Sequence, residues 1–481
     1  MKTLLISKLG ILFSSIAFIC FNTLLIANEY YFLLPLPLLL FIVYLGLFRI
    51  DTLLLAIVFF TPLSFNFEDL SIGGIGFYFP TEPLLLALML VFIGKSLLNK
   101  YWKSSTHLNH PLSIIIIIQL LWILITSISS EFPIISIKFL LSRAWFIFPI
   151  YFLSIHLFKK DINKIYQFLL AFILPLSIVL IVTLFKHASM GFSEEAGHWV
   201  MWPFFKDHTS YGAIVALFIP IIIGLIMHYK KQYSIKMLLQ FALTVFLIAL
   251  YFSYTRAAWL SVVGALGIYL LFYFKISFKW IALLMTFISI VLLVNSTEIS
   301  YLLEKNNSEH TTENFSERLE SMSNISSDAS NLERFNRWNC AIKLFKERPF
   351  FGWGPGTYSF VYAPFQDASD LTIISTNFGD GGNAHSEYLG PLAEQGLFGM
   401  LLMIGLVFCF FYRASWLYIK TKNQQVKAMT MMLILSLATY FSHGILNNYL
   451  DTDKASVPIW GMLAIFVALD CYHSKNITSK N

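Results

Sequence analysis

Long apolar runs separated by short polar connections occupy most of the chain. A bilayer core of about 30 Å is crossed by a helix of about 20 apolar residues, and runs of this kind follow one another here. The pattern predicts an all-α polytopic integral membrane protein with about 14 spans, give or take two. We place the spans at 9–27, 31–48, 51–66, 82–99, 112–130, 144–158, 165–185, 210–229, 237–254, 257–274, 279–296, 388–412, 428–446 and 456–473.

Some of these runs admit a second interpretation. The runs at 31–48 and 51–66 are short and contain prolines, and residues 131–143 could lie along the membrane surface instead of crossing it. The first run follows Lys2 and Lys8, as in a signal peptide, but no small-residue cleavage site follows it. We interpret it as a retained helix.

A polar interval, 297–386, interrupts the apolar series and divides the chain. We expect a transmembrane bundle at 1–296 with about 11 helices, a large outer loop at 297–386, and about three C-terminal helices within 387–481. Inside the loop, Ser330 to Glu333 fit a capping box, and an apolar stripe predicts a helix at about 331–347. Pro349 ends this helix, and glycines at 352–356 predict a tight turn.

Composition agrees with the membrane assignment: of 481 residues, 57% are hydrophobic and only 12% are charged. Lysines and arginines gather on alternate connections, such as 95–103, 159–164, 230–231 and 413–427. Positive charge is retained in the cytoplasm, so both termini are predicted inside and the interval 297–386 outside. The net charge of +6 therefore reflects topology and does not indicate nucleic-acid binding. Four scattered cysteines imply neither a disulfide framework nor a metal site.

Arginines are the first candidates for binding an anionic, lipid-linked substrate. Arg334 and Arg337 are three residues apart on the predicted loop helix, so both can project from one face. Solvation, pairing with Glu333 or contact with phospholipid headgroups would explain them equally well. Arg256 joins two apolar runs almost without a spacer, and a charge at membrane depth costs about 3 kcal/mol or more. It therefore faces a polar cavity or extends to the outer headgroups.

His385 lies where the polar interval meets the next apolar run, and imidazole exchanges protons near neutral pH. A structural role is the alternative, and Glu387 and Glu394 are the competing bases. We expect Glu394 to lie inside the following helix and to satisfy a polar contact there. The chain has no Walker A loop, GxSxG, HExxH or paired CxxC motif, which disfavours a nucleotide-using soluble enzyme.

Five short motifs resemble the O-antigen ligase and polymerase superfamily in order and spacing. They are PFFKDHTSYG at 203–212, YTRAAWL at 254–260, RFNRW at 334–338, PFFGWGPG at 349–356, and NAHSEYL with EQG at 383–396. The resemblance covers residues 202–450, and the first six spans match only as a hydrophobic pattern. Many relatives have Asn where this chain has His208.

This resemblance implies a GT-C-like glycosyltransferase of the bacterial inner (cytoplasmic) membrane, with its active site facing the periplasm. Its donor would be an undecaprenyl-diphosphate-linked glycan and its acceptor a lipid or glycan hydroxyl, as in lipopolysaccharide and other surface polysaccharide biosynthesis. Arg256 and Arg334 match the arginines expected on the diphosphate, and His385 matches the residue proposed to activate the acceptor. We place Arg337, His208 and Glu387 with the substrate-binding residues.

The chemistry supports the same assignment independently of the family. Guanidinium groups can stabilise a diphosphate leaving group without a metal, so we expect no metal and no cofactor. In-line attack by a hydroxyl would invert the anomeric centre. Ligase and polymerase activities are not separable from the sequence. A non-enzymatic polysaccharide flippase or exporter, also with about 12 to 14 spans, is the alternative of a different class.

Overall fold

Helices form almost all of the regular structure, which confirms the all-α prediction. The computed structural model describes residues 2–66, 78–99, 106–276, 329–367, 371, 375 and 382–474. The predicted span at 279–296, the polar segment 297–328 and the connections at 67–77 and 100–105 lie outside the described residues. The chain divides into two units, 1–54 and 55–481, and each is described by itself.

The first unit consists of α1 (Lys2–Ala27), α2 (Leu36–Phe48) and the beginning of α3 (Ile50–Phe60). Pro35 precedes α2 and fixes where it begins, and α2 ends 13 residues later at Phe48. Large apolar side chains along α1 and α2, among them Phe13 and Phe41, are exposed. A helix that is apolar on its outside is stable in lipid, as the sequence predicts for these runs.

Nine helices of the described part of the chain are long and apolar enough to cross a membrane. They lie at 81–98, 111–128, 133–160, 163–188, 208–228, 233–251, 256–273, 389–420 and 453–473. The helix α19 (Gln424–His443) has 20 residues but is not among the nine, and α1 to α3 supply three shorter apolar stretches. The prediction of a multi-pass helical membrane protein is confirmed.

The segment 133–160 differs from its prediction, because the span begins at Pro133 and the predicted start at 144 was wrong. It comprises α6 (Pro133–Phe146), the π-helical η4 (Ile147–Leu153) and α7 (Ser154–Lys160). Arg143 looked like the end of a polar segment, but it lies inside α6 and is buried. Its charge is tolerated there because it has an ionic and a carbonyl partner, described below.

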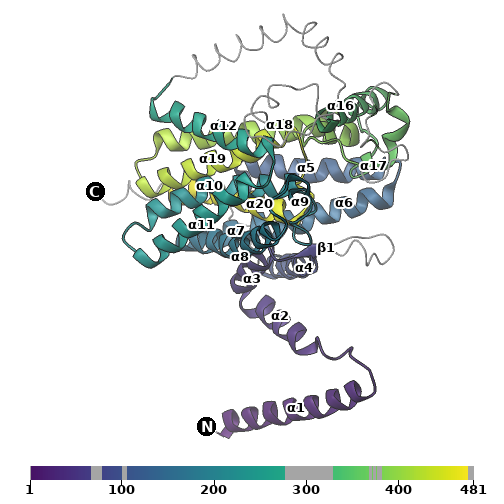
Figure 1. Cartoon of the computed structure of the whole chain (residues 1–481). Helices are drawn as coiled ribbons and strands as arrows, with labels where there is room; N and C mark the ends of the chain where they lie inside the picture. Colours follow the sequence, from purple (N-terminus) through teal and green to yellow (C-terminus); the bar gives the residue numbers. More distant parts are fainter. Residues whose placement is uncertain are drawn as a thin grey trace, which may run out of the picture. The chain divides into compact units, whose positions relative to one another are not determined.

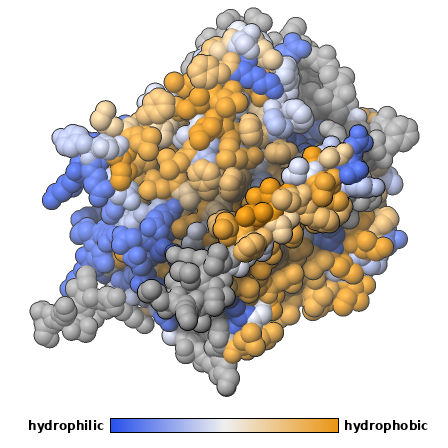
Figure 2. Space-filling model, turned by 90° about the horizontal axis from the view of Figure 1, so that it is seen from below, coloured by the Kyte–Doolittle hydropathy of each residue, from blue (hydrophilic) through white to orange (hydrophobic). Residues whose placement is uncertain are grey.

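The centre of the second unit is α20 (Asp453–Ala468), continued by η7 (Leu469–His473), and every residue of α20 is buried. It contacts α6, η4, α7 and α19 (Figure 1). Around it lie α4 (Thr81–Asn99), η3 (Thr106–Asn109), α5 (Pro111–Ile128), α8 (Asn163–Ala188), α9 (Glu194–Gly197), α10 (His208–His228), α11 (Tyr233–Tyr251) and α12 (Arg256–Tyr273). Two short strands, β1 (Phe65–Asn66) and β2 (Tyr78–Phe79), pair antiparallel. Hydrophobic residues spread over most of the face seen in Figure 2, with hydrophilic residues toward its edges.

The outer-loop helix predicted at 331–347 is present as α16 (Ala329–Glu347), followed by α17 (Tyr358–Val361) and η5 (Ala363–Phe365). The buried face of α16 differs from the predicted apolar stripe, which consists of Leu332, Phe335, Trp338, Ile342 and Phe345. Cys340, Ala341 and Leu344 are buried, whereas Ile342 is exposed. The helix is turned this way because small side chains allow close contact with α18 (Leu389–Lys420).

The glycine turn at 352–356 packs against α18 where that helix is interrupted, at Gly396 with φ +71° and ψ −170°. At this interruption, three carbonyl groups of α18 accept hydrogen bonds from residues outside the helix. Trp353 N donates to Ala393 O at 3.1 Å, Gly354 N donates to Glu394 O at 2.8 Å, and Trp122 Nε1 donates to Gln395 O at 2.9 Å. The predicted turn therefore fixes the end of the polar interval to the apolar helix that follows it.

Candidate active site

His385 stands in a strained position between the polar interval and the start of α18. Its φ is +45°, a left-handed value that costs energy in a residue other than glycine. Two contacts hold this backbone: His385 N donates to Asn383 Oδ1 at 3.0 Å, and Trp338 Nε1 donates to His385 O at 3.4 Å. The imidazole is thus placed by α16 and by an Asx turn together.

Burial and two neighbouring arginines lower the pKa of His385 to about 4. Burial disfavours the charged imidazolium, and the positive charges of Arg334 and Arg337 disfavour it further. Glu333 and a hydrogen bond with the Asn447 side chain act in the opposite direction and are weaker. The ring is consequently neutral at pH 7 and has a lone pair with which it can accept a proton.

Arg334 extends from α16 toward the end of α19. Its Nε donates to the carbonyl of Leu446 at 3.2 Å. Besides His385, its charge is within electrostatic reach of His208 and His443. Arg334 thus places a guanidinium group near three histidine side chains, and a guanidinium group can bind the oxygens of an anion.

Arg337 is turned differently, although it lies one helical turn from Arg334. Its Nε donates to Glu333 Oε1 at 2.6 Å, and its Cζ lies 3.9 Å from the centre of the Tyr362 ring. The side chain is buried. Pairing with Glu333, the structural alternative for the two arginines, is thus the arrangement found for Arg337, and the two guanidinium groups have separate surroundings.

Arg256 is the first residue of α12, and the residue before it, Thr255, is hydrogen-bonded to His208. Thr255 Oγ1 donates to His208 O at 2.8 Å, which ties the start of α12 to the start of α10. The His208 ring lies 4.2 Å from the ring of His198 in an edge contact. Asp207 caps α10 by accepting from Ser210 N at 2.7 Å. The structure therefore joins the two motifs, far apart in sequence, through Thr255 and the backbone of His208.

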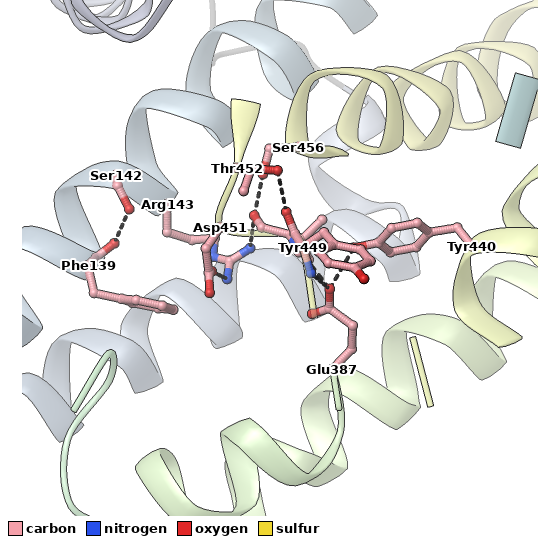
Figure 3. A network of polar contacts seen from close by, with 10 residues as sticks. Phe139, Ser142, Arg143, Glu387, Tyr440, Tyr449, Asp451, Thr452 and Ser456 are labelled. Carbon is pink, nitrogen blue, oxygen red and sulfur yellow. Dashed lines mark hydrogen bonds and ion pairs between the residues drawn. The ribbon is translucent and has the colours of Figure 1, made fainter. Parts of the chain in front are cut away.

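Glu387 is a buried carboxylate whose Oε1 accepts three hydrogen bonds. The donors are Tyr440 Oη at 2.6 Å, Tyr449 N at 2.7 Å and Leu450 N at 2.9 Å. Burial and the nearby Asp451 charge raise the pKa of Glu387, and these three bonds lower it in part. Glu387 thus joins the segment before α18 to residues 449–450 (Figure 3).

A cavity of about 1140 Å³ opens beside these residues. Of the predicted site residues, His385 and Glu387 line it, together with Asp207 and Asn448. Arg256, Arg334, Arg337 and His208 are not among its lining residues. The cavity wall also includes the apolar side chains of α6, such as Ile134 and Leu141, which are exposed and would face lipid. His385 therefore lies at a boundary between a large hollow and the arginine-bearing helix α16.

Arg143 was missed as a candidate, although it lines the same cavity. Its Nη2 lies 2.6 Å from Asp451 Oδ1, and its Nη1 donates to Leu450 O at 3.1 Å. It approaches the segment 449–452 from α6, while Glu387 approaches from the start of α18 (Figure 3). The available signal was a single arginine inside the apolar stretch 133–160, which marks a polar cavity.

Asn447 was also missed. Its Nδ2 lies 3.1 Å from His443 Nε2, and its side chain also acts on His385, where it raises the pKa of the imidazole. Nothing in the sequence indicates this, because residues 385 and 447 are joined only through α18 and α19. Glu394, in contrast, behaves as predicted: it lies within α18, and its Oε1 accepts from Tyr358 N at 3.0 Å.

Comparison with known proteins finds a family that matches the part of the chain with these residues. Residues 241–404 match the O-antigen ligase family, and this range includes Arg256, Arg334 and His385. The matched region belongs to the O-antigen ligase superfamily. The resemblance inferred from the motifs is thereby confirmed. An uncharacterized protein of Haemophilus influenzae is 23% identical over 291 residues, which cover 60% of this chain and 69% of that protein.

The O-antigen ligase match supports glycosyl transfer by a membrane protein, of the general ligase or polymerase type, with lipid-linked glycans as the substrate class. The matched region contains the helix with Arg334, the glycine turn and the segment with His385. It ends within α18, so α19, α20 and Asn447 lie outside the match.

Proposed function

We propose that this protein transfers or polymerises an undecaprenyl-diphosphate-linked oligosaccharide onto an acceptor hydroxyl on the outer side of the bacterial inner membrane. The observation that carries the proposal is His385: a neutral imidazole at a large cavity, beside Arg334, inside the O-antigen ligase match. A neutral imidazole, with one unprotonated ring nitrogen, next to a cationic group fits a reaction in which an alcohol attacks and a diphosphate departs.

The proposed step forms one bond and breaks one. The acceptor oxygen attacks the anomeric carbon of the donor sugar, and its proton passes to His385. The bond from that carbon to the diphosphate oxygen breaks, and its electron pair remains on the leaving undecaprenyl diphosphate. In-line displacement inverts the anomeric configuration. Arg256 and Arg334 stabilise the growing negative charge, which is the part of the reaction that a divalent metal serves in other enzymes.

The remaining predicted residues have supporting roles in this proposal. Glu387 positions residues 449–450 at the cavity, because its carboxylate accepts both of their amide hydrogens. Arg337 acts on His385 only through its charge, since Glu333 and Tyr362 engage its guanidinium group. His208 is within electrostatic reach of Arg334, and its carbonyl accepts a hydrogen bond from Thr255, the residue before Arg256.

Transfer in vitro tests the proposal. Purified protein is mixed with purified lipid-linked glycan and a panel of lipid and glycan acceptors, and new glycosidic bonds are measured by mass spectrometry. We expect product with the natural chain, none with His385→Ala, and unchanged product with His228→Ala, a histidine at the other end of α10. Retention of single-turnover chemistry in His385→Ala, with loss in Glu387→Gln, would move the base to the carboxylate.

Two outcomes bear on the exporter alternative and on the compartment. Movement of the lipid-linked glycan across a vesicle membrane without a new glycosidic bond would favour an exporter. Reporter fusions test the topology: we expect an outside reporter to be active at position 330 and an inside reporter at the C-terminus. The opposite result would place the reaction in the cytoplasm.

A further inference from the structure

A second cavity lies at the far end of α18, remote from His385. After the break at Gly396 the helix continues to Lys420, which corresponds to about 36 Å at about 1.5 Å per residue and is long enough to cross a bilayer core of about 30 Å. The cavity has a volume of about 440 Å³ and lies between the last turns of α18 and η7. Arg413, Trp416 and Lys420 come from α18, and Asp470 and Ser474 from the chain's end.

Arg413 is held in a defined position at this cavity. Its Nη2 lies 2.6 Å from Asp470 Oδ2, and the same oxygen lies 3.1 Å from His110 Nε2. The Cζ of Arg413 is 5.4 Å from the centre of the Trp416 ring. A guanidinium group carries five donor hydrogens, so the contact with Asp470 orients Arg413 and leaves donors for a further oxygen ligand.

Positive charge exceeds negative charge around the cavity. Arg413 and Lys420 contribute two cations, spaced so that both lie on one face of α18, and Asp470 contributes one carboxylate. Lys420 is exposed and forms no ion pair with another residue that the structure describes. Close by, Lys159 Nζ lies 4.8 Å from the ring of Tyr472 in η7. The cavity is therefore a basic site at the ends of several membrane helices.

The surface beside the cavity is suited to hydrocarbon. Phe408, Tyr412 and Ile419 are exposed on α18, and the rings of Phe408 and Tyr412 stack with centres 6.2 Å apart. Trp416 is also exposed on α18 and lines the basic cavity. A tryptophan between an apolar face and a cationic pocket is typical of the level of lipid headgroups.

We propose that this cavity binds the phosphate of an anionic phospholipid of the cytoplasmic leaflet. Arg413 and Lys420 receive the phosphodiester oxygens, and the acyl chains lie along the exposed apolar side chains of α18. Basic pockets between helices on the cytoplasmic side favour anionic lipids, because each lysine or arginine near the surface adds to the attraction. The basic connection 413–427 predicts that this end of α18 is cytoplasmic.

Lipid retention by the purified full chain tests the proposal. The protein is incubated with phosphatidylglycerol or with phosphatidylcholine of the same acyl chains, and bound lipid is counted by native mass spectrometry. We expect phosphatidylglycerol to be retained in preference. Arg413→Gln and Lys420→Gln should each reduce its retention roughly five-fold, while Lys422→Gln, the same charge change in the same connection but outside the cavity, should not.

Three results would overturn the proposal: equal retention of the two lipids, equal loss in Lys422→Gln, or displacement of phosphatidylglycerol by millimolar inorganic phosphate. The last would indicate a site for free phosphate. If Arg413→Gln does not fold, the exposed Lys420 still provides the test, since its substitution removes no buried contact. The measurement requires no transfer activity, so it is independent of the proposed function.

Discussion

The side chain of Asn447 meets the ring of His443, with 3.1 Å between Nδ2 and Nε2. The same side chain acts on His385 and raises the pKa of its imidazole. An amide that donates through Nδ2 can accept a hydrogen bond at Oδ1, so we expect Asn447 to favour the tautomer of His385 in which the ring nitrogen on its side carries hydrogen. The other ring nitrogen then keeps the lone pair that a general base needs.

The first prediction follows from this relationship. Asn447→Leu should lower kcat roughly ten-fold or more, with little change in KM for the donor, because the imidazole loses its preferred tautomer. Asn447→Asp should retain more activity, since a carboxylate also accepts this hydrogen, and should shift the acid limb of the pH profile upward. Equal kcat values for Asn447→Leu and the natural chain would show that Asn447 does not position His385.

The second prediction concerns pH. Protonated His385 cannot act as a base, and its pKa in the free protein is about 4. We expect kcat/KM to be constant near neutral pH and to fall as pH decreases through about 4. In the complex, the negative charge of the diphosphate offsets the positive charge of Arg334. The pKa of His385 should therefore be higher in the complex than in the free protein. The acid limb of kcat should therefore lie at higher pH than that of kcat/KM. A kcat/KM limb above pH 6 would contradict this.

The third prediction separates the arginines. Arg334→Ala and Arg256→Ala should lower kcat/KM about 100-fold or more, because a donor to the leaving group is lost in each. The lysine variants should recover only part of this, since an ammonium group lacks the planar fork of guanidinium. Arg348→Lys is the matched control, because Arg348 pairs with Glu131 at the surface. Full activity in Arg334→Lys would identify Arg334 as a headgroup anchor.

The fourth prediction concerns Glu387 and stability. Glu387→Ala should reduce the free energy of unfolding by about 2 to 6 kcal/mol, because two buried amide hydrogens lose their acceptor. Tyr440→Phe removes one donor to the charged group and should cost about 1 to 3 kcal/mol. Tyr412→Phe, at an exposed tyrosine, should have no effect. Thermal unfolding in detergent measures all three, and an unchanged Glu387→Ala midpoint would exclude the positioning role.

The fifth prediction tests how the outer loop is fixed. At Gly396, a Cβ would lie 2.2 Å from the carbonyl oxygen of Phe350, and φ is +71°. Gly396→Ala should therefore destabilise the protein by about 2 to 4 kcal/mol and expose the loop to protease. Gly405→Ala lies in the same helix with no atom within 4 Å of a new Cβ and should be tolerated. Equal protease resistance of the two variants would argue against the docking.

The sequence alone determined the class of protein and most of its elements. Apolar length and periodicity are local properties, so the membrane spans, the loop helix at 331–347 and the glycine turn were predictable. The motifs around Arg256, Arg334 and His385 indicated the O-antigen ligase superfamily, because their residues, order and spacing resemble that superfamily. The family match over residues 241–404 agrees.

The tertiary structure alone decided the roles that depend on distant contacts. Helical spacing put Arg334 and Arg337 on one face, but the packing of α16 against α18 gave them different neighbours: Leu446 for Arg334, and Glu333 with Tyr362 for Arg337. Arg143 and Asn447 reach the site from helices whose side-by-side placement no local pattern encodes. The physical reason is that charge and hydrogen-bond partners are set by packing across the whole bundle, whereas spans are set by the apolar length of each segment.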